Sequence, residues 1–166
     1  FIVSIITISM VSASNAAIGS LPKMWRGVNS DWTDREVTVV KEKVIEITIE
    51  KTFNFSVLKV TFSGGRLSFA TVGQENPQAV VAILVDGLAV TESLDYSSSL
   101  GFRNQCPTIS TIVEGLTQGI HTISVVIYKT NEIFPDGEGY LTYTTTPGYV
   151  PNTYKADLVV EEWISR

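Results

Sequence analysis

Histidine is the side chain best suited to proton transfer near neutral pH, and this chain has a single one, His121. It lies in the segment GIHTISVV, at the start of a run with strand character. A Ser-His-Asp triad would have to use His121 as its base, and one histidine excludes metal sites built from several. The sequence contains no G-x-S-x-G, H-E-x-x-H or phosphate-binding glycine loop. We therefore interpret His121 as a structural residue at a strand start, bonded to a neighbouring loop.

Acidic side chains could supply a catalytic pair of carboxylates or ligands for a cation. Glu161 and Glu162 are neighbours in a segment with strand character, so they point to opposite faces and cannot act as a pair. Asp136 and Glu138 lie with two glycines in the loop NEIFPDGEGY, and oxygen ligands in a turn suit Ca²⁺. The spacing matches no EF-hand, so a solvated acidic loop is the commoner interpretation of this weak calcium candidate. We expect no other cofactor and no enzymatic activity.

Two residues are candidates for modification. Asn54-Phe55-Ser56 fits the acceptor motif for N-glycosylation, which requires that the hairpin tip carrying it be exposed. Cys106 is the only cysteine, which excludes an intrachain disulfide and a thiolate zinc site. We interpret Cys106 as a small buried hydrophobic residue. The alternatives are an intermolecular bridge and a reactive thiol.

Aromatic side chains gather late in the sequence and before the first predicted strand. Flat exposed rings on a β-sandwich can stack on sugars, as in a carbohydrate-binding module, but Tyr and Trp are also enriched at subunit interfaces. We favour strand packing or an interface over sugar binding. The aromatic residues concerned are Tyr140, Tyr143, Tyr149, Tyr154, Trp25 and Trp32.

The composition fits one globular domain. Of the 166 residues, 44% are hydrophobic and 17% are charged, which is too apolar for a disordered chain. The formal net charge is −5 and the basic residues are scattered singly. Because nucleic-acid binding needs a basic surface, we exclude a nucleic-acid partner.

Short segments with strand character follow one another along the chain. Residues 44–50 (VIEITIE) alternate isoleucine with polar residues, which is the period of a half-buried strand. Asp86-Gly87, between AVVAILV and LAVT, predicts a hairpin with a type I′ turn. Ser63-Gly64-Gly65 predicts a tight turn between FSVLKVTF and RLSFATV. Further strands are predicted over residues 108–114, 121–128, 139–145 and 154–163.

No segment combines the helical period with a cap and a stop signal. About nine short strands with turn signals between them predict an all-β fold. We expect an antiparallel two-sheet β-sandwich that is jelly-roll-like in topology. Residues 36–166 are assigned to this sandwich, and the polar, small-residue stretch 13–35 is predicted to be a linker before it.

The opening residues 1–12, FIVSIITISMVS, form a separate apolar segment. They are too short to span a membrane, which needs about 20 apolar residues. A signal sequence followed by a small-residue cleavage site is one interpretation. Seven of the first eleven residues are β-branched, which disfavours helix, so we favour a retained N-terminal extension strand.

An apolar strand on a linker is an aggregation hazard unless it is buried. If it adds to the sheet of a neighbouring copy, main-chain hydrogen bonds supply affinity and alternate side chains supply specificity. Docking of this kind that does not close generates a filament. The alternative is an ordinary first strand of its own sandwich. The predicted subunit-interface residues are Phe1, Ile2, Val3, Ile5, Ile6, Ile8 and Met10.

Several segments together resemble the jelly-roll modules of phage tail-fibre and receptor-binding heads: VIEITIEKTFNFSVLKVTFSG, AILVDGLAV, GLTQGIHTISVVIYKTN and DLVVEEW. The chain is also similar to trimeric C1q/TNF-like sandwiches. The resemblance covers residues 36–164, and GLTQGIHTI is its most specific part. It implies an extracellular or virion assembly module, usually oligomeric and without catalytic residues. The opening strand departs from the pattern, because fibre heads normally follow a shaft.

The leading hypothesis is a structural subunit that assembles into an extracellular filament, pilus- or thread-like, or into a virion fibre. Its opening strand would dock into a neighbouring subunit. The first alternative is a trimeric receptor-binding head, or a capsid or tail decoration head. The second is a carbohydrate-binding module, which would show a row of exposed Trp or Tyr on one sheet face. The expected partners are copies of the chain, with a cell-surface or glycan receptor as a further candidate.

Overall fold

The structure is a computed structural model that describes residues 22–29, 35–71, 78–96, 101–129, 140–144 and 155–164, to which the structural statements below refer. All regular structure in these residues is β-strand, which confirms the predicted all-β class. The strands are β1 (Lys23–Asn29), β2 (Arg35–Glu36), β3 (Glu42–Lys51), β4 (Ser56–Ser63), β5 (Arg66–Thr71), β6 (Gln78–Val85), β7 (Leu88–Tyr96), β8 (Gly101–Gln105), β9 (Thr108–Val113), β10 (Gly119–Lys129), β11 (Tyr140–Thr144) and β12 (Ala156–Ile164).

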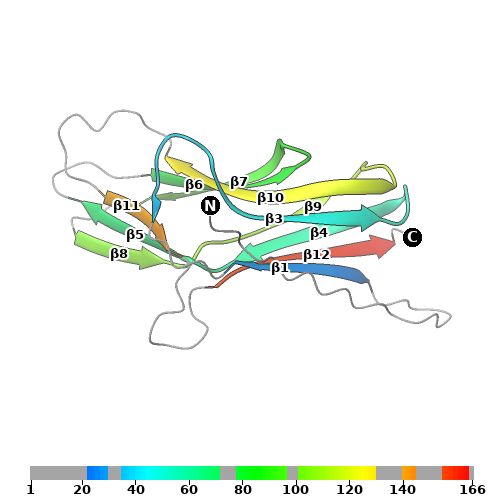
Figure 1. The fold of residues 1–166 in the computed structure, drawn as a ribbon, viewed down its shortest axis with the longest axis horizontal. Coiled ribbons are helices and arrows are strands. Elements are labelled where there is room, and N and C mark those ends of the chain that lie inside the picture. The colour runs from blue at the N-terminus through cyan, green and yellow to red at the C-terminus, as the bar shows by residue number, and fades with distance from the viewer. Residues whose placement is uncertain are drawn as a thin grey trace, which may run out of the picture.

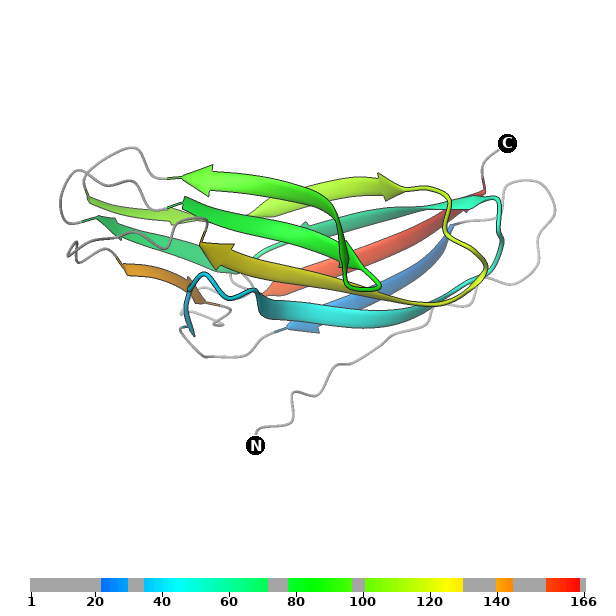
Figure 2. The same ribbon diagram turned by 90° about the horizontal axis from the view of Figure 1, so that it is seen from above.

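Two four-stranded antiparallel sheets face each other, in the orders β1-β12-β4-β9 and β3-β10-β6-β7 (Figures 1 and 2). Counted along the chain, these eight strands follow the order 1-8-3-6 in one sheet and 2-7-4-5 in the other. This interleaving of early and late strands is the jelly-roll arrangement. The predicted β-sandwich is therefore confirmed.

A third sheet, β2-β11-β5-β8, continues the sheet β1-β12-β4-β9 towards one end of the molecule (Figure 1). The predicted tight turn at Gly64-Gly65 is wrong, because β4 and β5 run on in the same direction. Ser63 pairs with Thr108 and Leu67 with Gln105, so the β4–β5 side holds one residue more than its partner. This extra residue is a β-bulge that bends the sheet.

The glycines at this bulge are required by their backbone conformation. Gly64 has φ +109° and Gly65 has φ +68°. Residues other than glycine rarely adopt these backbone angles. The Gly64 N–H donates to the Pro107 carbonyl at 3.1 Å. A Cβ on Gly64 would lie 1.9 Å from the backbone oxygen of Lys155, so β12 also approaches closely here.

The predicted hairpin at Asp86-Gly87 is confirmed. Val85 of β6 and Leu88 of β7 form the last pair of the hairpin, which leaves Asp86 and Gly87 as a two-residue loop. Both have positive φ, +50° and +83°, as a type I′ turn requires.

The core lies between the two facing sheets and follows the alternation of their strands. In β12, Ala156, Leu158 and Val160 point inward, whereas Asp157 and Val159 are less buried. The inward residues of both sheets form one hydrophobic cluster that includes Ile47, Phe62 and Ile123. Each fully buried aliphatic side chain contributes about 1.5–3 kcal/mol.

The structure differs from the sequence prediction within the predicted linker. Lys23–Asn29 form β1, which pairs with β12 along its length and buries Trp25. Gly27 permits this strand to lie close to the opposite sheet, because a Cβ there would lie 2.4 Å from Cγ2 of Ile47. Residues 1–21, with the apolar segment 1–12, lie outside the described residues.

Candidate functional site: an apolar end surface anchored by Glu162

Glu162 is a carboxylate on the core-facing side of β12. It continues the inward phase of Leu158 and Val160, and it is only 4% exposed. Its neighbour Glu161 points outward and pairs with Lys59 at 3.1 Å. The prediction that Glu161 and Glu162 face opposite ways is confirmed.

The turn between β3 and β4 supplies the hydrogen bonds that Glu162 needs. Its carboxylate accepts from the backbone N–H of Thr52 at 2.9 and 3.1 Å, from that of Phe53 at 3.0 Å, and from the Ser56 hydroxyl at 2.5 Å. Burial raises the pKa of Glu162, but these donors outweigh burial, so its pKa is lowered from the ordinary value. Glu162 is therefore an ionised anchor for the turn, and its oxygens are occupied.

A buried cation holds the same turn from the other side. Lys51 is fully buried at the end of β3, and its ammonium group donates to the backbone carbonyl of Phe53. The backbone N–H of Phe53 thus donates to Glu162, and the backbone carbonyl of Phe53 accepts from Lys51. A buried charge is costly unless it is hydrogen-bonded, so this arrangement constrains the turn strongly.

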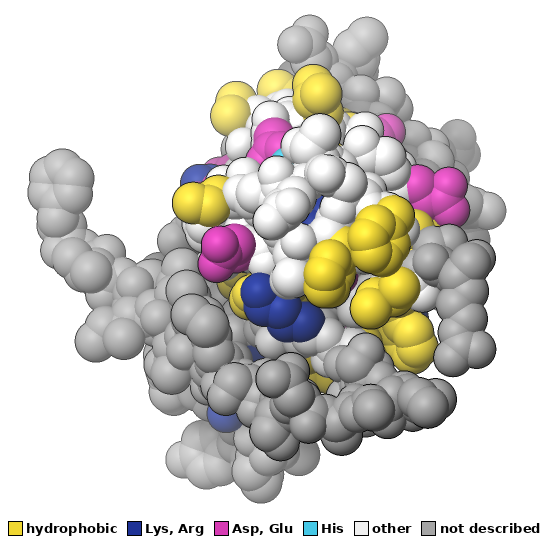
Figure 3. Space-filling view, turned by 90° about the vertical axis from the view of Figure 1, so that its right-hand side faces the viewer, with side chains coloured by type: hydrophobic (Ala, Val, Ile, Leu, Met, Phe, Trp, Pro, Cys, Tyr) yellow, Lys and Arg dark blue, Asp and Glu magenta, His cyan; other side chains and the backbone are white. Residues whose placement is uncertain are grey.

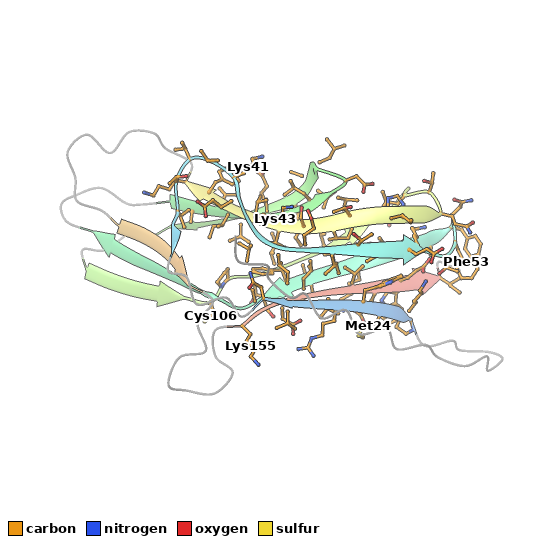
Figure 4. The ribbon with its side chains drawn as sticks, viewed as in Figure 1. Met24, Lys41, Lys43, Phe53, Cys106 and Lys155 are labelled. Carbon is orange, nitrogen blue, oxygen red and sulfur yellow. The ribbon has the colours of Figure 1, made fainter. Side chains whose placement is uncertain are left out.

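The anchored turn presents aromatic rings to solvent. Phe53 is 39% exposed and Phe55 is 61% exposed, and their rings stack with centroids 5.3 Å apart. Together with Met24, Trp163 and Ile164, they form the set that we call the end surface. Hydrophobic side chains gather on this end of the molecule in Figure 3, and Figure 4 shows Phe53 and Met24 at the same end.

The strand register explains why these residues meet. Lys23, at the start of β1, lies opposite Glu162, and Ile164, at the end of β12, lies opposite Ser56. Met24 lies opposite Glu161 on the outer face, so Trp163, two residues further on, is its diagonal neighbour. The end surface is therefore built from the outer end of one sheet and from the β3–β4 turn.

The end surface can bind apolar partners by burying its rings. Soluble proteins rarely leave several large apolar side chains exposed together, and such patches mark interaction sites. This site was not predicted from the sequence. Its signal there is the pair of phenylalanines on either side of Asn54.

His121 is a structural residue, as predicted. Its Nδ1 lies 2.7 Å from Asp86 Oδ2, and its Nε2 lies 2.8 Å from the Thr117 carbonyl oxygen. Burial lowers the pKa of His121, but the bonds to Asp86 and Thr117 outweigh burial and raise it. Because both partners only accept, the ring must be protonated to donate to both. Both nitrogens are engaged, so neither is placed to activate a serine.

Asn54 and Cys106 are both exposed. Asn54 lies in the β3–β4 turn, and its side-chain oxygen accepts from the Gln118 N–H at 2.5 Å; its glycosylation remains a prediction. The interpretation of Cys106 as a buried residue is wrong. Cys106 lies at the bend between β8 and β9, where the next residue, Pro107, occupies the buried position.

The other candidate residues are only partly covered by the structure. Trp25 is a core residue, so it is not available for stacking on a sugar. Tyr140 and Tyr143 lie in β11, but nothing is described of their side chains. The remaining candidates lie outside the described residues: Asp136, Glu138, Tyr149, Tyr154, Trp32 and the interface residues Phe1, Ile2, Val3, Ile5, Ile6, Ile8 and Met10.

In the described part of the chain, no group of three or more His, Cys, Asp or Glu side chains is placed to hold a metal ion. The same residues form no helix that is long and apolar enough to cross a membrane.

No known protein family matches the sequence, and no curated protein matches it. Among solved structures, dimeric latent PorU from Porphyromonas gingivalis aligns with 92% of this chain at 9% identity and a TM-score of 0.42, over 14% of PorU. The VP2 subviral particle of infectious bursal disease virus aligns with 98% at 15% identity and a TM-score of 0.40, over 42% of that chain. T=1 particles derived from the same virus align with 98% at 18% identity and a TM-score of 0.42, over 41%.

The chain therefore spans less than half the length of each of these proteins. Identity and TM-score are both too low for these likenesses to carry an argument about function. The jelly-roll arrangement follows from the strand order of this chain.

Proposed function

We propose that this protein is a non-enzymatic structural subunit that assembles with copies of itself into an extracellular filament or a virion fibre. The observation that carries the proposal is the end surface, where Phe55 is 61% exposed and Trp163 is 46% exposed. An isolated molecule would leave these rings in water. Their burial between subunits supplies a driving force for assembly.

The sequence supports the same proposal independently. Residues 1–12 are rich in β-branched and apolar side chains and carry no charged side chain. Such a segment must be buried against protein to stay soluble. In the proposed assembly it docks on a neighbouring copy as an extended donated segment, which buries its apolar side chains.

The test compares the full chain with two variants, Ile6→Asp and Thr7→Asp. Both add one negative charge, but positions 6 and 7 lie on opposite faces of a strand, and Thr7 is not among the predicted interface residues. Size-exclusion chromatography with light scattering and negative-stain electron microscopy would report the assembly state. We expect filaments or open-ended oligomers from the full chain and from Thr7→Asp, and loss of assembly in Ile6→Asp.

Two other results would overturn the proposal in different ways. Closed trimers from all three proteins would favour a receptor-binding or decoration head, because donation by residues 1–12 would then be dispensable. Stable monomers from all three would favour a carbohydrate-binding module, in which Phe53, Phe55 and Trp163 contact a ligand. Binding to a glycan panel would then be measured.

A further inference from the structure

We infer that the end surface is the receiving site for residues 1–12 of a second copy, so that assembled copies converge with these ends facing one another. The inference rests on the proposed function, to which it adds the receiving surface and the orientation of the subunits. It depends on where the chain enters the fold, on the length of the preceding segment, and on the construction of the surface.

The chain enters the sandwich at the end that carries the end surface. β1 begins at Lys23, which lies opposite Glu162, and Glu162 anchors the turn that holds Phe53 and Phe55. The ammonium group of Lys23 donates to the Glu50 carbonyl at 2.9 Å and to the Thr52 hydroxyl at 3.3 Å, which fixes the start of β1 beside the β3–β4 turn. Residues preceding Lys23 are therefore attached at this end.

The length of the connection limits where the segment can dock. Residues 13–22 separate the apolar segment from β1. Ten residues reach at most about 35 Å when fully extended. The segment can therefore reach a molecule placed against this end, whereas the end of the sandwich that carries β5, β8 and β11 lies at the far side of the long axis (Figure 1).

The surface faces along the long axis and away from the body of the molecule (Figure 3). A segment pairing with its own edge strand β1 would lie along the side of the sheet and leave Phe55 and Ile164 uncovered. A second molecule placed end-on covers them. This geometry favours a neighbouring copy as the source of the docked segment.

The apolar segment 1–12 and the end surface match in hydrophobic character. Residues 1–12 carry no charged side chain, and the end surface consists of two phenylalanines, a tryptophan, an isoleucine and a methionine. The nearby outward charges Lys59 and Glu161 neutralise each other at 3.1 Å. Because Glu162 and Lys51 fix the turn before any partner arrives, docking loses little conformational freedom on this side.

The location of donor and receiver at one end determines the form of the assembly. Each copy gives its segment and receives another at the same end, so the sandwiches radiate from a common axis with their opposite ends outward. A rotation with a rise about this axis gives the filament of the proposed function, whereas a pure rotation would close a ring or a dimer.

Cross-linking of the full chain tests the inference. A photoreactive benzoyl-phenylalanine would replace Ile5, and ordinary and ¹⁵N-labelled chains would be unfolded together, refolded and irradiated. Mass spectrometry would then locate each cross-link and show whether it joins two copies. We expect mixed-isotope cross-links from position 5 to residues 53–57 or 163–164.

Three results would overturn the inference, and they separate its failure from that of the proposed function. Mixed-isotope cross-links confined to another surface, such as β7 or β9, would overturn the receiving site but leave strand donation standing. Cross-links within one isotope only, in a chain that still assembles, would place the segment on its own copy. Absence of any assembly would overturn the proposed function as well.

A matched pair of surface variants gives a second readout. Phe55→Asp places a charge in the end surface. Val40→Asp places a charge just before the start of β3, at the opposite end of that strand, where Val40 is 67% exposed and Phe55 is 61% exposed. We expect Phe55→Asp to weaken assembly more than about ten-fold, as loss of a central aromatic contact does, and Val40→Asp to leave it unchanged. Equal effects of the two variants, with both folded by circular dichroism, would contradict the inference.

Discussion

The carboxylate of Glu162 accepts a hydrogen bond from the backbone N–H of Phe53 at 3.0 Å, while the ring of Phe53 is exposed to solvent. One residue is thus held through its backbone by a buried charge and presents its side chain outward. The same carboxylate also binds Thr52 and Ser56. The position of the exposed Phe53 is therefore set by a bond from the interior of the sandwich.

Replacing Glu162 by glutamine should destabilise the fold. The glutamine amide lacks the charge that strengthens the hydrogen bonds from Thr52, Phe53 and Ser56. Its NH₂ group would also face these donors and could not accept from them. We expect a loss of about 2–3 kcal/mol in the free energy of unfolding, measured by urea denaturation. The adjacent Glu161→Gln, which breaks only a partly exposed ion pair, should cost about 0–1 kcal/mol. Equal losses would contradict the assigned role of Glu162.

The lowered pKa of Glu162 predicts an acid-sensitive turn. Its stabilisation is present above the ordinary glutamate pKa of 4.5 and is lost as the pH falls through the lower, folded-state pKa. The free energy of unfolding of the native chain should therefore fall more steeply below pH 4.5 than that of Glu162→Gln. Parallel pH profiles of the two proteins would show that Glu162 is not the responsible group.

His121 predicts that the free energy of unfolding changes with pH in the opposite direction. Its raised pKa means that its stabilisation is complete below the ordinary histidine pKa of 6.5 and is lost as the pH rises through the folded-state pKa. Because the chain has one histidine, an NMR titration of its ring protons gives a single curve. We expect a midpoint above 6.5, and a lower midpoint in Asp86→Asn, which lacks the carboxylate partner.

Gly64→Ala tests the bulge between β4 and β5. The substitution places a methyl group at φ +109° and 1.9 Å from the Lys155 oxygen. We expect a loss of more than about 2 kcal/mol, seen as a lowered thermal midpoint. Gly87→Ala is the control, because its φ is +83° but nothing lies within 4 Å of the added Cβ, so strain of about 1 kcal/mol is expected. Similar losses would show that the contact with Lys155 is unimportant.

The sequence allowed the β-sandwich to be predicted where local pattern and tertiary position agree. The alternation of Ile45, Ile47 and Ile49 identified β3, and Asp86-Gly87 identified the β6–β7 hairpin. Both signals are contained within a few neighbouring residues. Their physical basis, side-chain period and positive φ, is the same in isolation and in the fold.

Features that depend on distant partners could not be predicted in this way. Gly64-Gly65 fits a turn as well as a bulge, and only the pairing of both flanking strands with β8 and β9 distinguishes them. β1 was missed because Gly27 weakens its strand pattern, although that glycine is needed beside Ile47.

The site was missed for a similar reason. The alternation of Ala156, Leu158 and Val160 places Glu162 inward, but its partners lie more than one hundred residues earlier in the chain. The exposure of Phe53 and Phe55 follows from that long-range anchor. Neither property is encoded in the neighbouring sequence.

The position of β12 between β1 and β4 also sets an order of events during synthesis. Among the described strands, β1 pairs only with β12, and the β3–β4 turn is anchored by Glu162 of that same strand. On the ribosome, neither can reach its final arrangement until residues 156–164 have emerged. The end surface is therefore completed only after the other strands of the two facing sheets have been made.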